Sequence, residues 1–338
     1  MKIFLASCLL FISSAVFAQT PDSAVYYFKK GEEEKTARRF MIAADYFNRA
    51  IHFDPKYTDA YLENGFTSIQ MRKTDEALHF FSKAYEVDPG NMIAGNQLMD
   101  LYFSYHQYQN AMDIAKKCKT CPNADRVIAL AYFYLEDYAA SEKLLIKQIQ
   151  KNPADAELNY ILGRAYLEME LEAKAIPYYL KAVELQPDNY NWLSQLGLVY
   201  YAKEDYKNAV VYFKKALEKG FTQNLEFNEN FGFAYIYSGE FEKGEKLLLD
   251  VSDKKKGNKE ILRELSIVYY ERKMYDKSLD LCQKLMELDM KDGKALYQAG
   301  LCFIKKGQSE RGQQMCDRAI ELDPSLNKLR QKKMSVGL

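Results

Sequence analysis

A short pattern of small and bulky residues returns along this chain at a nearly constant interval, and that regular spacing limits the fold more than any other feature. The segments 76–89, 174–187 and 311–324 each place a small residue, a bulky residue four positions later and another small residue three after that. We call the first small residue the anchor. The nine anchors are Ala43, Ala77, Ala111, Ser141, Ala175, Ala209, Gly244, Ser278 and Gly312, and the one clearly short interval separates Ala111 from Ser141. This regularity predicts an array of similar units, each packing on its neighbours.

A second pattern lies upstream of the anchors. A glycine stands twelve positions before six of them, at Gly31, Gly65, Gly163, Gly197, Gly232 and Gly300. A tyrosine stands three positions after that site in six copies, at Tyr102, Tyr132, Tyr166, Tyr200, Tyr235 and Tyr269. Spacings of three, four and seven put these residues on one helical face. Glycine within a helix costs about 1 kcal/mol relative to alanine, so its recurrence indicates that two helices must approach closely.

Prolines mark where the second helix of a unit is expected to end. They are Pro55, Pro89, Pro153, Pro187 and Pro324, and a proline cannot continue the helical hydrogen-bond ladder. Asp or Asn often follows, as in Asp188 and Asn189, and its side chain suits the N-cap of the next helix. Each unit is therefore predicted to be a helix, a turn and a second helix.

This pattern resembles the tetratricopeptide repeat over positions 24–324, nearly all of the chain after its first segment. The resemblance implies an all-α, right-handed α-solenoid of about nine helix-turn-helix repeats. The repeats are predicted at about 24–57, 58–91, 92–121, 122–155, 156–189, 190–224, 225–258, 259–292 and 293–324. A capping helix and tail are expected over 325–338, since a solenoid needs a solvated end. We expect irregularity near 118–128, where one interval is short, and a solvated loop near 252–259.

Residues 1–18 have the features of a secretory signal peptide. Lys2 precedes a short apolar stretch, and Val16-Phe17-Ala18 fits the small-x-small rule, so the mature chain is expected to begin at Gln19. Two alternatives are an uncleaved membrane anchor and a lipoprotein whose lipobox is Leu5-Ala6-Ser7-Cys8. The apolar stretch is shorter than the roughly 20 residues that span a bilayer, and most of it follows Cys8. The sequence therefore predicts export to the periplasm, with envelope association as the alternative.

The charge balance bears on the kind of partner. The 47 basic and 47 acidic residues cancel, which argues against a dominant electrostatic attraction to nucleic acid or anionic lipid. Tyrosine, by contrast, is abundant, with 27 residues against one tryptophan. A protein or peptide partner is expected, and the oligomeric state is left open.

In the family that the sequence resembles, partners usually lie in a concave groove lined by the first helices. The resemblance therefore implies a partner-binding groove at the equivalent positions. These include Phe66, Phe103, Phe133, Tyr160, Arg164, Tyr201, Phe233, Tyr237, Arg263, Tyr270 and Tyr297. Aromatic residues and arginine are the residue types that anchor interfaces. The alternative for each ring is that it packs between repeats and meets no partner.

One subclass of the family grips a chaperone C-terminus with a carboxylate clamp of Lys, Asn and Arg. The equivalent positions here carry Phe28 and Glu32 in the first repeat, and Leu62 and Phe66 in the second. These residues do not supply the clamp, so chaperone-tail binding is not predicted.

Five cysteines remain once Cys8 leaves with the leader. Cys118 and Cys121 have three interpretations: a local disulfide at the irregular junction, two unpaired thiols, or a redox pair without the strand-to-helix setting that activates such cysteines. Cys282 and Cys316 occupy the bulky packing position four residues after an anchor, which favours buried thiols. A bridge among these two and Cys302 needs Cα distances to be judged.

No constellation for catalysis is found. His52, His79 and His106 lack metal-ligand spacing, and neither a phosphate-binding loop nor a nucleophile elbow occurs. We therefore expect no metal, no cofactor and no enzymatic activity. The predicted function is a protein- or peptide-binding scaffold of the bacterial cell envelope. The alternatives are a cell-wall or carbohydrate-binding accessory protein, since tyrosine rings also stack on sugars, and a redox-linked accessory protein acting through Cys118 and Cys121.

Overall fold

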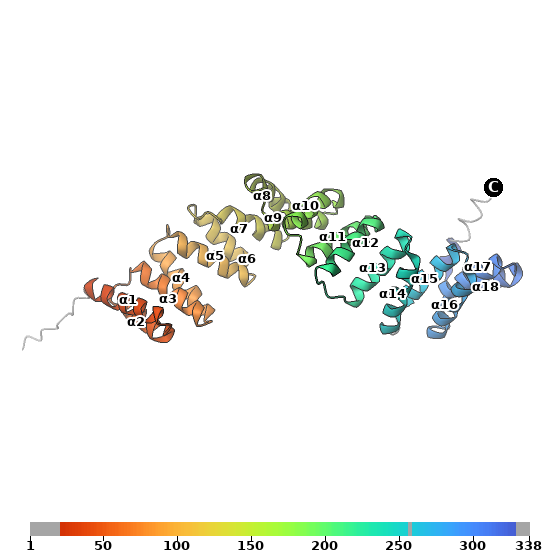
Figure 1. Ribbon diagram of the computed structural model, residues 1–338, viewed down its shortest axis with the longest axis horizontal. Coiled ribbons are helices and arrows are strands. Elements are labelled where there is room, and N and C mark those ends of the chain that lie inside the picture. The colour runs from red at the N-terminus through yellow and green to blue at the C-terminus, as the bar shows by residue number, and fades with distance from the viewer. Residues whose placement is uncertain (1–20, 256–258, 329–338) are drawn as a thin grey trace, which may run out of the picture. The chain divides into compact units, whose positions relative to one another are not determined.

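The computed structural model describes residues 21–255 and 259–328 of the chain. These residues form eighteen α-helices and one short 3₁₀ helix, and they contain no strand (Figure 1). The predicted signal peptide and the end of the predicted C-terminal tail lie outside the described residues. The sequence-based prediction of an all-α repeat solenoid is confirmed.

The chain divides into two compact units, Met1–Ala175 and Ile176–Leu338, and the division falls inside one helix. Unit 1 contains α1 (Pro21–Thr36), α2 (Phe40–Phe53), α3 (Thr58–Gln70), α4 (Thr74–Val87), α5 (Met92–Ser104), α6 (Tyr108–Lys117), α7 (Ala124–Tyr134), α8 (Tyr138–Lys151) and α9 (Ala156–Glu168). The helix that contains the division is α10 (Glu172–Leu185). Unit 2 continues with α11 (Tyr190–Ala202), α12 (Tyr206–Glu218), α13 (Leu225–Ser238), α14 (Phe241–Lys254), α15 (Lys259–Glu271), α16 (Tyr275–Leu288), α17 (Gly293–Lys305), α18 (Ser309–Leu322) and η1 (Pro324–Leu326).

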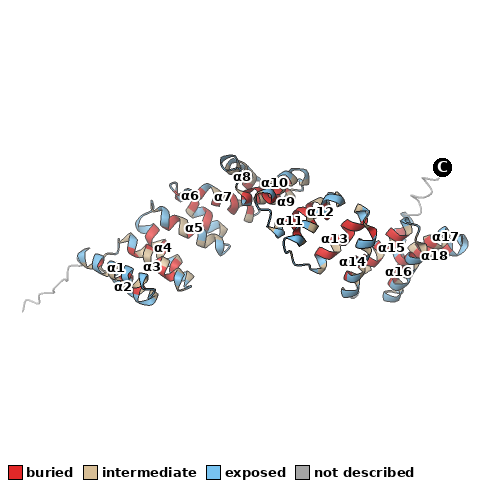
Figure 2. Ribbon diagram, viewed as in Figure 1, coloured by how far each residue is buried: buried red, intermediate tan, exposed pale blue. Residues whose placement is uncertain are grey.

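Helices pack in order of sequence within each unit. In unit 1 each of α1 to α8 packs on the helix that follows it, and α11 to α17 do the same in unit 2. Each of the nine stretches predicted as a repeat contains one odd-numbered first helix and one even-numbered second helix. Figure 2 shows buried residues along the sides of the helices that face their neighbours. Within each unit the buried side chains are therefore shared between consecutive helices.

The anchors lie where the two helices of a repeat come closest. The Ser141 hydroxyl donates to the Ala129 carbonyl at 2.9 Å, and the Ser278 hydroxyl donates to the Ser266 carbonyl at 2.7 Å. Both acceptors stand twelve positions before the anchor, where other repeats carry glycine. In repeats with alanine, as at Ala43 and Ala209, the anchor is fully buried. Small anchors recur because a larger side chain would separate the helices.

The bulky residue four positions after the anchor packs against the upstream glycine. A β-carbon added to Gly31 would lie 2.5 Å from the Phe47 ring, and one added to Gly197 would lie 2.6 Å from Phe213. The same approach occurs between Gly232 and Leu248. Glycine is thus required because the ring or branched side chain rests directly on the helix backbone. This contact explains the residue pattern from which the helix pairs were predicted.

Two of the recurring tyrosines tie successive repeats together. The Tyr166 hydroxyl donates to Glu142 Oε1 at 2.8 Å, and the Tyr269 hydroxyl donates to Glu245 Oε1 at 2.5 Å. Each of these carboxylates belongs to the second helix of the preceding repeat. A lysine also lies over several of these rings, as Lys277 does over Tyr269 at 5.3 Å from the ring centroid. Tyr166 and Tyr269 therefore link one repeat to the next and are structural.

The turn between the two helices of a repeat has a positive φ in all nine repeats. Two of these residues are Gly239 and Gly307. The others carry side chains: Arg38, Arg72, His106, Glu136, Glu170, Glu204 and Lys273. Asparagine and aspartate cap several first helices, and Asn189 Oδ1 accepts from the Trp192 backbone N–H at 3.2 Å. This capping agrees with the expectation from the Asp and Asn that follow the prolines.

Three local expectations are refined. The short interval before the fourth anchor falls on two short helices, α6 with 10 residues and α7 with 11. The solvated loop expected near 252–259 overlaps α14, which continues through Lys254 with the fully buried Val251 in its last turns, and residues 256–258 lie outside the described residues. The expected capping segment begins as η1, whose Leu326 packs against Tyr297 and Cys316, and its remainder lies outside the described residues. None of the described helices combines the length and the apolar character needed to cross a membrane.

Candidate partner-binding surface

The predicted groove residues lie on first helices, and we call their surroundings the first-helix face of each unit. In unit 1, Phe66 on α3 packs edge-on against Phe81 with ring centroids 5.1 Å apart, and Lys35 Nζ lies 5.5 Å from its centroid. Phe103 on α5 contacts the rings of Tyr108 and Tyr134 at 5.1 and 5.5 Å. Phe66 and Phe103 are half-buried. The face is therefore partly apolar, as its residue types predicted.

Arg164 on α9 extends this aromatic surface. Its guanidinium carbon lies 4.9 Å from the Phe133 ring centroid and 5.9 Å from that of Tyr160. The described residues offer Arg164 no carboxylate within ion-pair distance, whereas Arg126 pairs with both Asp155 and Glu157. Burial raises the pKa of Tyr160, and the positive charge of Arg164 opposes that shift. Arg164 thus presents N–H donors held on aromatic rings.

In unit 2 the first-helix face is dominated by tyrosine. Tyr201 on α11, Tyr206 at the start of α12 and Tyr237 on α13 form what we call the tyrosine cluster. Tyr201 and Tyr206 have ring centroids 5.6 Å apart, and Tyr206 and Tyr237 are 4.8 Å apart. Tyr237 is 44% exposed. Burial, followed by the nearby Tyr237, Tyr206, Glu229 and Glu264, raises the pKa of Tyr201 to about 12.

Not every predicted residue is free to meet a partner. Phe133, Phe233 and Tyr297 are each less than 9% exposed. Neighbouring helices cover these rings, so they can pack under the residues of a partner-binding surface but cannot contact a partner themselves. Arg263 on α15 forms ion pairs with Asp292 at 2.9 Å and with Glu260 at 3.4 Å. The half-buried Tyr270 packs against Tyr275, with ring centroids 5.7 Å apart.

The sequence prediction missed Tyr108, Tyr206 and Tyr275, which complete the aromatic face from the first turn of a second helix. All three stand three residues before an anchor, where Phe40, Tyr138 and Phe241 also occur. That recurrence was a usable signal. It was overlooked because these residues lie on second helices, whereas the family resemblance directs attention to first helices.

Cys118 and Cys121 are joined by a disulfide, with their Cα atoms 5.4 Å apart. Both residues are buried, at 1% and 5% exposure. Their sulfur atoms pack on Gly95 of α5, where an added β-carbon would lie 2.8 Å from Cys121 Sγ. A redox relay needs a sulfur that a partner can reach. This geometry favours the structural alternative, in which the bridge holds the junction between α6 and α7.

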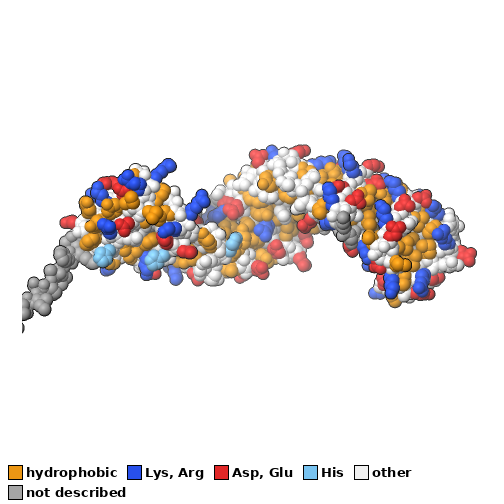
Figure 3. Space-filling model, turned by 90° about the horizontal axis from the view of Figure 1, so that it is seen from below, with side chains coloured by type: hydrophobic (Ala, Val, Ile, Leu, Met, Phe, Trp, Pro, Cys, Tyr) orange, Lys and Arg blue, Asp and Glu red, His pale blue; other side chains and the backbone are white. Residues whose placement is uncertain are grey.

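The remaining candidates for chemistry are also buried or dispersed. Cys282, Cys302 and Cys316 form no disulfide and are buried, which agrees with the packing role expected for Cys282 and Cys316. Burial raises the pKa of the Cys282 thiol to about 12, so it is protonated at neutral pH. The histidine side chains lie apart in Figure 3, and over the described residues no group of His, Cys, Asp and Glu is arranged to hold a metal ion.

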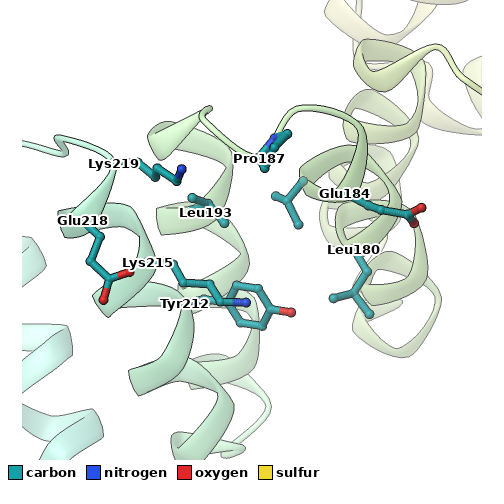
Figure 4. Close-up of a pocket in the computed structure, with 9 residues that line it drawn as sticks. Leu180, Glu184, Pro187, Leu193, Tyr212, Lys215, Glu218 and Lys219 are labelled. Atoms are coloured by element: carbon teal, nitrogen blue, oxygen red, sulfur yellow. The ribbon is translucent and has the colours of Figure 1, made fainter.

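A pocket of about 510 Å³ lies on the second-helix side of unit 2 (Figure 4). Leu180 on α10, Leu193 on α11 and Tyr212 on α12 supply apolar walls. Lys215, which also lines the pocket, places its Nζ 4.8 Å from the Tyr212 ring centroid. Lys219 forms an ion pair with Asp188 at 2.6 Å. This pocket is one of the hollows on the surface, and the sequence pattern did not predict it.

Comparisons with family models agree with the helix-pair architecture. Models described as tetratricopeptide repeat match residues 126–190, 173–223 and 293–326. No curated protein sequence matches the chain significantly. Among solved structures, the chain is similar to YrrB, described as a tetratricopeptide repeat protein with an unusual peptide-binding site. That structure is 25% identical, the match covers 56% of this chain and 97% of YrrB, and the TM-score is 0.44.

Two further structures have lower TM-scores. The MamA protein is 24% identical over 59% of this chain and 93% of its own, with a TM-score of 0.34. The tetratricopeptide repeat domain of P58(IPK) is 16% identical over 93% of this chain and 99% of its own, with a TM-score of 0.30.

Proposed function

Because the chain belongs to the tetratricopeptide repeat family, whose fold serves protein–protein interaction, we propose that it is a non-enzymatic scaffold that binds a protein or peptide on its first-helix faces. The observation that carries the proposal is the set of half-buried or exposed aromatic side chains on those faces. In unit 1 they are Phe66, Phe103 and Tyr160, and in unit 2 they are Tyr201, Tyr237 and Tyr270. Such residues give a partner apolar contact area at low conformational-entropy cost.

The proposed location is the bacterial cell envelope, after removal of residues 1–18. The leader pattern supports this location, and so does the disulfide between Cys118 and Cys121, since disulfides persist in oxidising compartments. Charges of both signs are interspersed on the surface shown in Figure 3, which fits a protein partner better than a polyanion.

The test is affinity capture from envelope extract, with the chain from Gln19 onward immobilised and the bound proteins identified by mass spectrometry. A variant with Tyr160, Tyr201 and Tyr237 replaced by alanine is expected to lose partners that the unaltered chain retains. The matched control replaces Tyr26 and Tyr105, exposed by 57% and 50% and outside the predicted groove positions, and is expected to retain them. Retention of every partner by the triple variant would show that the first-helix faces are not the binding surface.

A further inference from the structure

The tyrosine cluster of unit 2 differs from several other aromatic groups of this protein in having no cation over its rings. Elsewhere, lysine and arginine side chains cover aromatic faces, as Lys214 covers Tyr235 at 5.3 Å and Arg272 covers Phe241 at 4.1 Å. No such contact involves Tyr201, Tyr206 or Tyr237 among the described residues. No lysine or arginine of the described residues therefore occupies a face of these rings, and their ring contacts are with one another and with Phe233, which stacks on Tyr237 with centroids 6.2 Å apart.

The charge around the cluster is negative. After burial, the groups that raise the pKa of Tyr237 are Glu264, Tyr206 and Glu271, and none of these is a cation. Glu264 and Glu271, both on α15, are exposed and form no ion pair with any described residue. The nearby Glu229 is neutralised by its ion pair with Lys255. Two carboxylates without an ion pair therefore lie near the tyrosine cluster, Glu264 near Tyr201 and Tyr237 and Glu271 near Tyr237.

We propose that this surface, Tyr201, Tyr206, Tyr237, Glu264 and Glu271, binds a lysine or arginine side chain of the partner. An aromatic ring attracts a cation through its quadrupole, and adjacent carboxylates add direct charge complementarity. The alkyl stem of such a side chain lies along the rings while its charged end reaches the carboxylates. The inference rests on the proposed scaffold function and specifies the chemistry of one contact.

The probes for the test are two capped twelve-residue peptides, one repeating Gly-Ser-Lys and one repeating Gly-Ser-Glu, titrated into the chain from Gln19 onward by calorimetry at low salt. The lysine peptide is expected to bind and the glutamate peptide is not. Replacing Glu264 and Glu271 together by glutamine should weaken lysine-peptide binding about fivefold. The charge-matched control, Glu218→Gln with Glu242→Gln, changes two exposed carboxylates elsewhere in unit 2 and should change affinity less than twofold.

The role of the ring is tested separately at the exposed Tyr237. Tyr237→Leu keeps an apolar side chain but removes the quadrupole, so it should weaken the lysine peptide about fivefold, whereas Tyr237→Phe should bind as the unaltered chain does. Equal effects of the cluster and control glutamine pairs would overturn the proposal, because binding would then follow net charge alone. Stronger binding of a neutral sugar, N,N′-diacetylchitobiose, with loss of that binding in Tyr237→Leu only, would overturn it in favour of carbohydrate.

The envelope capture separates this inference from the function on which it rests. If captured partners remain bound to Tyr237→Leu and to the glutamine pair at Glu264 and Glu271, the cation site is refuted while the scaffold function stands. If the unaltered chain captures no protein, the scaffold function fails, and the peptide titration still decides whether the surface recognises a cation.

Discussion

Side-chain volume at two facing positions sets the distance between the helices of each repeat. Three repeats carry a phenylalanine four residues after the anchor, namely Phe47, Phe81 and Phe213. In these repeats the residue twelve positions before the anchor is glycine, and the ring rests on its backbone. In the third repeat the sizes are exchanged: Met99 stands at the upstream position and Ala115 at the downstream one, and both are buried. The summed volume is similar in these four repeats, as expected of interiors packed close to crystal density.

Gly312 is expected to tolerate no side chain, although most anchors are alanine. A β-carbon there would lie 2.5 Å from the Gly300 carbonyl oxygen and 2.8 Å from the Ile304 backbone nitrogen. Gly312→Ala should lower the free energy of unfolding by about 1 kcal/mol, because overpacking costs about 1–3 kcal/mol and alanine recovers up to about 1 kcal/mol of helix propensity. Urea denaturation followed by circular dichroism measures the change.

Gly90→Ala is the matched control for that substitution. The nearest atom to its added β-carbon is Asp88 Oδ1 at 3.4 Å, and Gly90 is exposed in a turn. Its effect should stay within about 0.5 kcal/mol. Equal midpoints for the two variants would mean that the close approach of α17 and α18 is not what requires glycine at the anchor.

At the scale of elements, consecutive repeats are joined by a tyrosine that reaches backward. Tyr269 on α15 donates to Glu245 on α14, and Lys277 on α16 binds the same carboxylate at 2.8 Å. Burial by itself would raise the pKa of Glu245, but the hydrogen bonds from Lys277 and Tyr269 hold it below its ordinary value of 4.5. One carboxylate thus connects three helices.

Tyr269→Phe is expected to lower the free energy of unfolding by about 1.5 kcal/mol at pH 7, because it removes a hydrogen bond to a charged group. A lowered carboxyl pKa contributes stability above the ordinary pKa and loses it as pH falls through the folded value. The difference between the unaltered chain and Tyr269→Phe should therefore be full at pH 7 and shrink below about pH 4. Urea midpoints across this pH range measure it.

The control for that experiment is Tyr200→Phe at the equivalent position of another repeat. Tyr200 stacks on Tyr212 with ring centroids 5.4 Å apart, and its hydroxyl has no hydrogen-bond partner among the described residues. Its loss should change stability by less than about 0.5 kcal/mol at every pH. A pH-independent loss in Tyr269→Phe would show that the charge of the Glu245 carboxylate is not what stabilises this contact between repeats.

The helices were predictable because anchor, bulky residue and proline recur at fixed spacing, and each marks a contact that only one geometry satisfies. The turns were not, since Arg72 and Lys273 take a backbone conformation that favours glycine and nothing in the residue types signals it. For the candidate surface, spacing placed the rings on first helices but could not separate the exposed Tyr237 from the buried Phe233. That difference depends on how neighbouring helices cover each ring.

At the scale of the whole molecule, compartment and covalent state are linked. The chain carries six cysteines, of which Cys8 lies in the predicted leader, two form the disulfide and three are buried thiols. Disulfides persist in exported proteins and are rare in the reducing cytosol. An exported chain should therefore differ from a retained one in both its first residue and its thiol count.

The protein isolated from its native cells, alkylated under denaturing conditions without reductant, is expected to begin at Gln19 and to take up three alkyl groups. Reduction before alkylation should raise the uptake to five, because it opens the bridge between Cys118 and Cys121. Intact-mass spectrometry reads both values from one sample. Ala18→Asp serves as the control, since it removes the small residue that the signal peptidase requires and should leave the leader attached. A native chain that begins at Met1 and takes up six groups without reductant would contradict export. A native chain that begins at a lipid-modified Cys8 would show that the protein is anchored at the membrane and is not released into the periplasm.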